Sequence, residues 1–201
     1  MALRLHDEFA LPSDGDGEEI RRLKQILENG VPSDQQSAVE QLIKLRAETA
    51  LTECLASNKP LVVHLATGAL WECWFNEQGT KARREMDKGI KLMNDGELEA
   101  ALKVFERLVE QYPRWAEAHN KQATVFYLLG NPRLSMKACK IVVELKPHHF
   151  GAWNGMALCA AQLEKWQIAL DAARKALSLQ PSAQANLDLI QLAQSNLDEQ
   201  K

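Results

Sequence analysis

The sequence predicts an all-α protein, a right-handed superhelix of three helical hairpins with an N-terminal helical extension and a C-terminal cap helix. Three observations predict this class. Prolines and small residues recur with a fixed period in the second half of the chain. Apolar residues elsewhere follow the spacing of one helix face. The chain has 201 residues, 46% of them hydrophobic, so it is large enough to bury cores between such elements.

The first 32 residues are expected to form an acidic lead and a short helix. Residues 14–17 alternate aspartate with glycine, which indicates a flexible segment. Apolar residues at helical spacing follow from Ile20 to Leu27. Asn29 and Gly30, followed by Pro32, mark the end of this helix.

Residues 33–81 are expected to form a degenerate helical hairpin. Ser33 opens a Ser-Asp-Gln-Gln pattern, which predicts a capping box at the start of one amphipathic helix that continues to Cys54. A second helix, from about residue 61 to residue 76, is apolar almost all round and is therefore expected to be buried. Its residues Trp71 and Trp74 lie 34 positions before Phe105 and Leu108, so we expect the hairpin to continue the superhelix at its N-terminal end.

Residues 82–183 carry the strongest signal, an internal repeat. Pro113, Pro147 and Pro181 are 34 residues apart. Two sets of small residues share that period: Gly89, Ala123 and Ala157, and Ala101, Ser135 and Ala169. Small residues allow two helices to approach closely, and a proline ends the second helix of each pair.

This pattern resembles the tetratricopeptide repeat, a helix–turn–helix unit of 34 residues. The units are 82–115, 116–149 and 150–183, and residues 184–201 follow as a cap helix. Gly96 and Gly130 match the turn glycine of the repeat, whereas Glu164 replaces it in the third unit. In the cap helix we expect Leu187, Ile190 and Leu197 to pack inward, since a terminal repeat needs a polar outer face.

Three strings are similar to a group of bacterial and plastid tetratricopeptide proteins. They are Ala-Glu-Ala-His-Asn-Lys-Gln-Ala-Thr at 116–124, Tyr-Leu-Leu-Gly at 127–130 and His-His-Phe-Gly-Ala at 148–152. This resemblance implies a soluble intracellular protein of the plastid stroma, with the cytoplasm as the alternative.

The concave face is the expected binding site, because the first helix of each repeat lines it. By register it presents a peptide-binding groove of apolar and polar side chains: Arg83, Met86, Ile90, Met93, Asn94, Asn120, Lys121, Thr124, Tyr127, Leu128, Asn154, Leu158 and Gln162. Methionines adapt to apolar ligands of imperfect fit, and asparagines can pair with a peptide backbone. We therefore expect a scaffold, adaptor or assembly factor that binds an apolar or amphipathic segment of a protein partner.

Four alternatives remain open for this groove. The methionines can pack against the neighbouring hairpin, the helix of residues 20–27 can fill the groove, or the chain can form a structural homodimer. Some proteins of the resembled family hold chaperone tails with Lys and Asn at set positions. Here Met86, Ile90, Gly151 and Gly155 stand there, and Asn120 and Lys121 offer only part of such a clamp.

Other function classes find little support. The net charge of -3 argues against a nucleic-acid partner, and no apolar run has the roughly 20 residues of a membrane span. The histidines at 64, 119, 148 and 149 show no metal-ligand or triad spacing, so we predict no enzyme, metal or cofactor, and a capping or packing role for His148 and His149. The four cysteines are widely spaced, which predicts buried free thiols in a reducing compartment.

Overall fold

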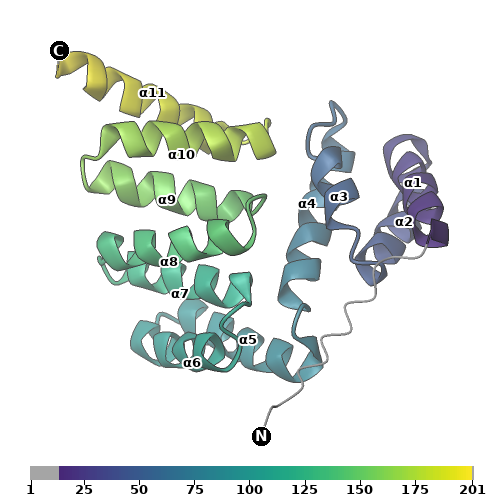
Figure 1. Ribbon diagram of the computed structural model, residues 1–201, viewed down its shortest axis with the longest axis horizontal. Helices are drawn as coiled ribbons and strands as arrows, with labels where there is room; N and C mark the ends of the chain where they lie inside the picture. Colours follow the sequence, from purple (N-terminus) through teal and green to yellow (C-terminus); the bar gives the residue numbers. More distant parts are fainter. Residues whose placement is uncertain (1–13, 201) are drawn as a thin grey trace, which may run out of the picture. The chain divides into compact units, whose positions relative to one another are not determined.

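The computed structural model describes residues 14–200 and contains eleven α-helices there (Figure 1). Most of the acidic lead expected at the start of the chain lies outside the described residues. The described residues divide after Ala69 into two compact units, which are treated separately below.

The first unit contains α1 (Asp14–Asn29), α2 (Pro32–Lys44), α3 (Glu48–Cys54) and the start of α4 (Pro60–Phe75). Helix α1 packs against α2 and α3, with Leu23 and Leu27 fully buried. The Lys59 ammonium donates to the carbonyl of Glu28 at 2.6 Å and so ties the end of α1 to the segment before α4. The apolar face of α1 is thus used within this unit, which argues against its insertion into the groove.

Three local expectations for this unit are wrong. Helix α1 begins at Asp14, so the residues predicted to be flexible form its first turn. Helix α2 begins at Pro32 without a side-chain cap, because a proline at the first helical position already has the required φ. Ser33 therefore forms no capping box, and its hydroxyl bonds to the neighbouring Asp34 carboxylate. The single helix expected to reach Cys54 is interrupted where Arg46 adopts a left-handed φ of 49°.

The second unit is a stack of helix pairs (Figure 1). Its complete helices are α5 (Gly79–Asn94), α6 (Leu98–Gln111), α7 (Ala116–Leu128), α8 (Pro132–Leu145), α9 (Phe150–Gln162), α10 (Trp166–Leu179) and α11 (Gln184–Glu199). Within each pair the two helices pack along their length, and α11 covers α10 and the edge of α9. The predicted all-α fold of three hairpins and a cap helix is confirmed.

The turns of this stack repeat with the sequence period. Each repeat proline lies two residues after the last residue of α6, α8 or α10. Between the two helices of each pair the backbone enters the left-handed region, at Gly96 (φ 81°), Gly130 (φ 72°) and Glu164 (φ 56°). Glu164 therefore adopts the conformation of the glycine that it replaces.

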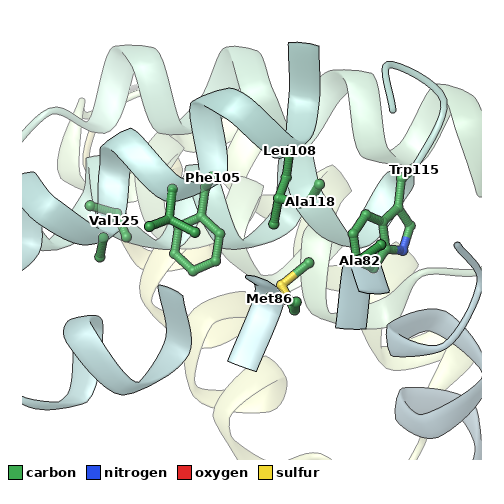
Figure 2. Packing of buried hydrophobic residues seen from close by; sticks show 9 residues of the cluster. Ala82, Met86, Phe105, Leu108, Trp115, Ala118 and Val125 are labelled. Atoms are coloured by element: carbon green, nitrogen blue, oxygen red, sulfur yellow. The ribbon is translucent and has the colours of Figure 1, made fainter. Parts of the chain in front are cut away.

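Small residues stand where the helices approach most closely, as predicted. Ala101, Ala157 and Ala169 have no exposed surface. A Cβ atom added at Gly89 would lie 2.6 Å from the ring of Phe105, which is itself fully buried. The first two repeats share a core that contains Met86, Phe105 and Trp115, and Figure 2 shows these side chains between their helices.

The cap helix α11 begins at the predicted Gln184, ends at Glu199, and has a shifted inner face. Asn186, Leu189 and Ala193 are its buried residues, whereas Leu187 is 38% exposed. Ile190 and Leu197 pack against the neighbouring cores as expected. The inner face follows positions three to four apart from Asn186, and Leu187 falls beside that face.

In the described part of the chain, residues 14–200, no helix combines the length and the apolar character needed to cross a membrane.

Candidate functional site

The concave side of the second unit is formed by α5, α7, α9 and α11. These helices contact one another in series along the stack, whereas α6, α8 and α10 do not pack on one another to the same extent. The first helices of the hairpins therefore lie on the inner side of the curve. This is the face on which the repeat register places the groove residues.

In the first repeat, the predicted groove residues are mostly committed to packing. Met86 has no exposed surface and lies among Phe105, Leu108 and Trp115 (Figure 2). Ile90 and Met93 pack partly against the same core. The expectation that Met86 offers an adaptable surface is thus wrong, because the large aromatic residues of the hairpin enclose it. Asn94 is exposed, and Arg83 is ion-paired as described below.

In the second repeat, the groove residues divide into a bonded half and an exposed half. Asn120 is buried, and the Thr124 hydroxyl donates to its carbonyl at 3.0 Å. Lys121 is half-buried and forms an ion pair. One turn further along α7, Tyr127 is 36% exposed and Leu128 is 51% exposed.

The third repeat shows the same division. The side-chain amide of Asn154 donates to that of Asn186 at 2.7 Å and joins α9 to the cap helix. Leu158 packs partly against the core between α9, α10 and α11. Gln162, at the end of α9, is exposed.

The start of the concave face is covered by residues 70–77 of the same unit, which we call the aromatic segment. The Trp71 indole lies edge-on to the rings of His149 and Phe150, each with a centroid distance of 5.4 Å. Its tip fills the space that a side chain at Gly151 would occupy, 2.8 Å from an added Cβ atom. The tryptophans of α4 therefore contact the start of the third repeat. That residues 33–81 form a hairpin which continues the superhelix stays a prediction.

Trp74 is the most deeply held residue of the aromatic segment. It has no exposed surface, and its indole stacks on the His149 imidazole with centroids 4.1 Å apart and planes 20° apart. Its backbone carbonyl accepts a hydrogen bond of 2.7 Å from the indole N–H of Trp115. This carbonyl lies in the last turn of α4, where helix carbonyls begin to lack helical amides, and Trp115 supplies it with a donor.

Charged side chains surround the aromatic rings. The Arg83 guanidinium contacts the Glu72 carboxylate at 3.0 Å and lies 5.0 Å from the centre of the Phe75 ring. The Lys121 ammonium lies 5.2 Å from the Trp71 ring and 5.1 Å from the Phe75 ring. Each cation is within range of attraction to an aromatic face.

Beneath these rings lies a fully buried pair, Glu117 and His149. The His149 Nδ1 accepts the backbone N–H of Ala152 and so caps α9, which confirms the predicted capping role. Its Nε2, 2.9 Å from the Glu117 carboxylate, must then carry the proton and donate it to that oxygen. The geometry therefore specifies a neutral imidazole.

The carboxylate of Glu117 is also held by Asn120 and Lys121. The Asn120 amide donates to it at 3.2 Å, and the Lys121 ammonium lies at 3.3 Å. Burial alone would raise the pKa of Glu117, but the hydrogen bond from His149 and the positive charge of Lys121 outweigh burial and lower that pKa. Glu117 is thus a buried carboxylate whose charge is stabilised by His149, Asn120 and Lys121.

The cysteines of the chain are all buried free thiols, as predicted. Burial raises the pKa of Cys54 to about 11 and that of Cys139 to about 12. Among the described residues, no group of three or more His, Cys, Asp or Glu side chains is placed to hold a metal ion.

Comparisons with known proteins agree with this fold. The family model of anaphase-promoting complex (cyclosome) subunit 3 matches residues 94–176. A TPR repeat-containing protein of Rhizobium etli is 34% identical over 83 residues, which are 41% of each chain. A human FK506-binding protein-like protein is 27% identical over 139 residues, 64% of this chain and 40% of that protein. The matches thus span about two fifths of the length of these curated relatives.

Two solved structures are similar in fold. The first TPR of Spaghetti (RPAP3), bound to the HSP90 peptide SRMEEVD, covers 57% of this chain and 90% of its own, with a TM-score of 0.56 and 17% identity. The MamA protein covers 90% of this chain and 84% of its own, with a TM-score of 0.56 and 13% identity. At these identities the likeness establishes the fold of the repeats.

Proposed function

We propose that this tetratricopeptide repeat protein is a scaffold or adaptor that binds an amphipathic segment of a partner protein on its concave face. The observation that carries the proposal is the aromatic segment, residues 70–77. A short helical piece with Trp71, Trp74 and Phe75 lies on the first helices of the repeats and is held by aromatic, ionic and hydrogen-bonded contacts. The face therefore has the chemistry to hold a helical segment with aromatic and acidic side chains.

A further part of the concave side is open to solvent. The exposed groove residues Asn94, Tyr127, Leu128 and Gln162 all stand at the C-terminal ends of α5, α7 and α9. Tyrosine and leucine beside amide side chains suit an apolar segment whose backbone needs hydrogen-bond partners. This end of the groove supports contact with a partner while the aromatic segment is in place.

The charge arrangement argues against an acidic chaperone tail as the ligand. The Lys121 ammonium is already paired with Glu117, and the Arg83 guanidinium with Glu72 and Asp87. Gly151 and Gly155 contribute no side chain, and Met86 is buried. A peptide such as the SRMEEVD bound by the solved neighbour would meet cations that are already neutralised.

The proposal is tested with a photo-crosslinking amino acid at Leu128, in the full chain, exposed to an extract of the source cells. We expect one protein to be crosslinked, and to be lost when Tyr127→Glu is added to the same chain. The control places the crosslinker at the exposed Ile141 on the convex helix α8. Equal products from both positions would contradict binding on the concave face.

The alternative function, a structural homodimer, is tested on the same full chain by light scattering over a range of concentrations. A mass independent of concentration and equal to 22.6 kDa excludes it. A plastid stromal location stays a prediction, because the curated relatives above come from a bacterium and from human and do not support it. The buried free thiols are consistent with a reducing compartment.

A further inference from the structure

We infer that the aromatic segment is an internal ligand, and that the partner binds by replacing it with a helix of the same chemistry. That helix ends in two aromatic residues three positions apart, with an acidic residue between them, as in Trp71-Glu72-Cys73-Trp74. The inference rests on the proposed function and deepens it, since it names the kind of segment that the concave face takes.

The way the aromatic segment is held permits exchange. Among the described helices, α4 is not one of those that pack along their length against a helix of the repeats. Leu70, Cys73 and Trp74 of the segment are buried, and side-chain contacts and one backbone carbonyl hold it. Trp71 is only half-buried, and the Glu72 side chain is 47% exposed. The helices of the repeats pack on one another without α4, so the segment can leave without separating the helix pairs.

The surface beneath the segment is specific for what lies on it. We call it the receptor surface, and it consists of Arg83, Trp115, Lys121, His149 and Gly151. Gly151 leaves space for the tip of one indole, and the His149 ring stacks on the other. The Trp115 indole N–H bonds a carbonyl at a helix end, and Arg83 pairs with a carboxylate. A replacing helix therefore needs two aromatic side chains, an acidic side chain and a C-terminus at this point.

Two residues of the receptor surface, His149 and Lys121, are held by partners outside the segment. His149 is fixed by the bonds from its two ring nitrogens to Ala152 and Glu117. Lys121 is fixed by Glu117, which also accepts the bond from Asn120. None of these bonds involves the aromatic segment. A preorganised surface spends less free energy on ordering when a new ligand arrives.

The internal ligand sets a threshold for the partner. A segment tethered in the same chain acts at an effective concentration on the order of millimolar. The apparent affinity for an outside helix is reduced by the fraction of chains in which the segment is displaced. Weakening the contacts between the segment and the receptor surface must therefore strengthen the binding of an outside helix. If the segment did not compete with that helix, the same substitutions would leave its binding unchanged or weaken it.

The experiment uses a fluorescent, amidated peptide of residues 62–78 with Cys73→Ser, and the full chain as receptor. Trp71→Ala in the chain removes an internal contact and leaves a hole that the peptide can fill. We expect this variant to bind the peptide about tenfold or more tightly than the unchanged chain. The exposed Glu72→Arg is a second opening variant that leaves all apolar contacts intact. Trp166→Ala, a half-buried tryptophan on α10, is the control and should change nothing.

A charge exchange then tests the position of the peptide. The chain with Arg83→Glu repels its own Glu72, and we expect it to prefer a peptide with Glu72→Arg over the unchanged peptide. Arg133→Glu, on the exposed surface of α8, is the control and should keep the original preference. Inversion of the preference by Arg83→Glu alone supports replacement on the receptor surface.

Other results overturn the inference. If neither opening variant binds the peptide more tightly while both stay folded by circular dichroism, the segment is a fixed part of the fold. If light scattering shows a dimer that Trp71→Ala abolishes, the replacing helix comes from a second copy, and the partner helix is ruled out. Either result leaves the crosslink at Leu128 unaffected, so the proposed function and this inference fail separately.

Discussion

Glu117 and His149 are both fully buried and are joined by a 2.9 Å hydrogen bond between the carboxylate and Nε2, although 32 residues separate them. The bond joins the first helix of the second repeat to the start of the first helix of the third. The Trp74 ring stacks on the His149 imidazole, and both are fully buried. One residue pair thus connects the stacking of the repeats with the surface that holds the aromatic segment.

Replacing Glu117 should weaken the fold in a pH-dependent way. The folded protein lowers the pKa of this carboxyl, so its contribution to stability is present above the unfolded value of about 4.3 and is lost as the pH falls through the folded value. We expect Glu117→Gln to lower the free energy of unfolding by about 1–3 kcal/mol at pH 7, and by less below pH ~4. Urea unfolding at both pH values measures this, with the exposed Glu110→Gln as the control.

Two glycines should respond in opposite ways to alanine. At Gly89 the new Cβ atom meets the fully buried Phe105 ring at 2.6 Å, so Gly89→Ala should cost about 1–3 kcal/mol. At Gly151 its one close contact is the tip of the half-buried Trp71, which can move, while the His149 ring lies at an ordinary 3.5 Å. The gain in helix propensity offsets the loss. Thermal unfolding should show a lower midpoint for Gly89→Ala and little change for Gly151→Ala. A comparable loss at both positions would mean that Trp71 is as rigid as Phe105.

Glu164 should tolerate glycine. Its φ of 56° costs a residue with a side chain about 1–2 kcal/mol, whereas glycine adopts it freely. The greater freedom of glycine in the unfolded chain cancels part of this gain. We expect Glu164→Gly to raise the free energy of unfolding by up to about 1 kcal/mol, and Glu164→Ala to bring no such gain. Denaturant titration of the two variants measures this. If alanine stabilised the protein as much as glycine, the left-handed backbone at Glu164 would not be the cause of the gain.

The four cysteines should not react with thiol reagents in the folded protein. Burial raises the pKa of Cys139 to about 12 and that of Cys54 to about 11, so neither thiol is ionised at pH 8. We expect a thiol reagent to label none of the four cysteines of the native chain and all of them in denaturant. Rapid labelling of the native protein would show that one of the buried sites opens.

The repeats were predictable because their signal is redundant. The prolines, the small residues and the turn glycines share one period, and each has a separate physical reason to recur. The substitution at Glu164 did not hide the turn, because the neighbouring repeats fix its position. The repeat register placed Tyr127 and Leu128 on the groove side, and the structure leaves both side chains exposed.

The receptor surface was not predictable, for an equally physical reason. The spacing of Trp71 and Trp74 defines an apolar helix face but does not say what covers it, and the same face fits a stacked hairpin or the concave side of the repeats. Glu117 and His149 are far apart in sequence, and neither is apolar. Their only signals were an acidic residue in the first turn of one helix and a histidine at the start of another. The break at Arg46 carries no glycine or proline to mark it.

The contact between Trp71 and Gly151 tests the central claim most directly. A nuclear Overhauser experiment on the full chain, with labelled tryptophan and glycine, measures it without any substitution. The account predicts a cross-peak between the ring tip of Trp71 and the α-protons of Gly151. Absence of that cross-peak, with the Trp71 ring in contact with solvent only, would contradict the placement of the aromatic segment on the concave face.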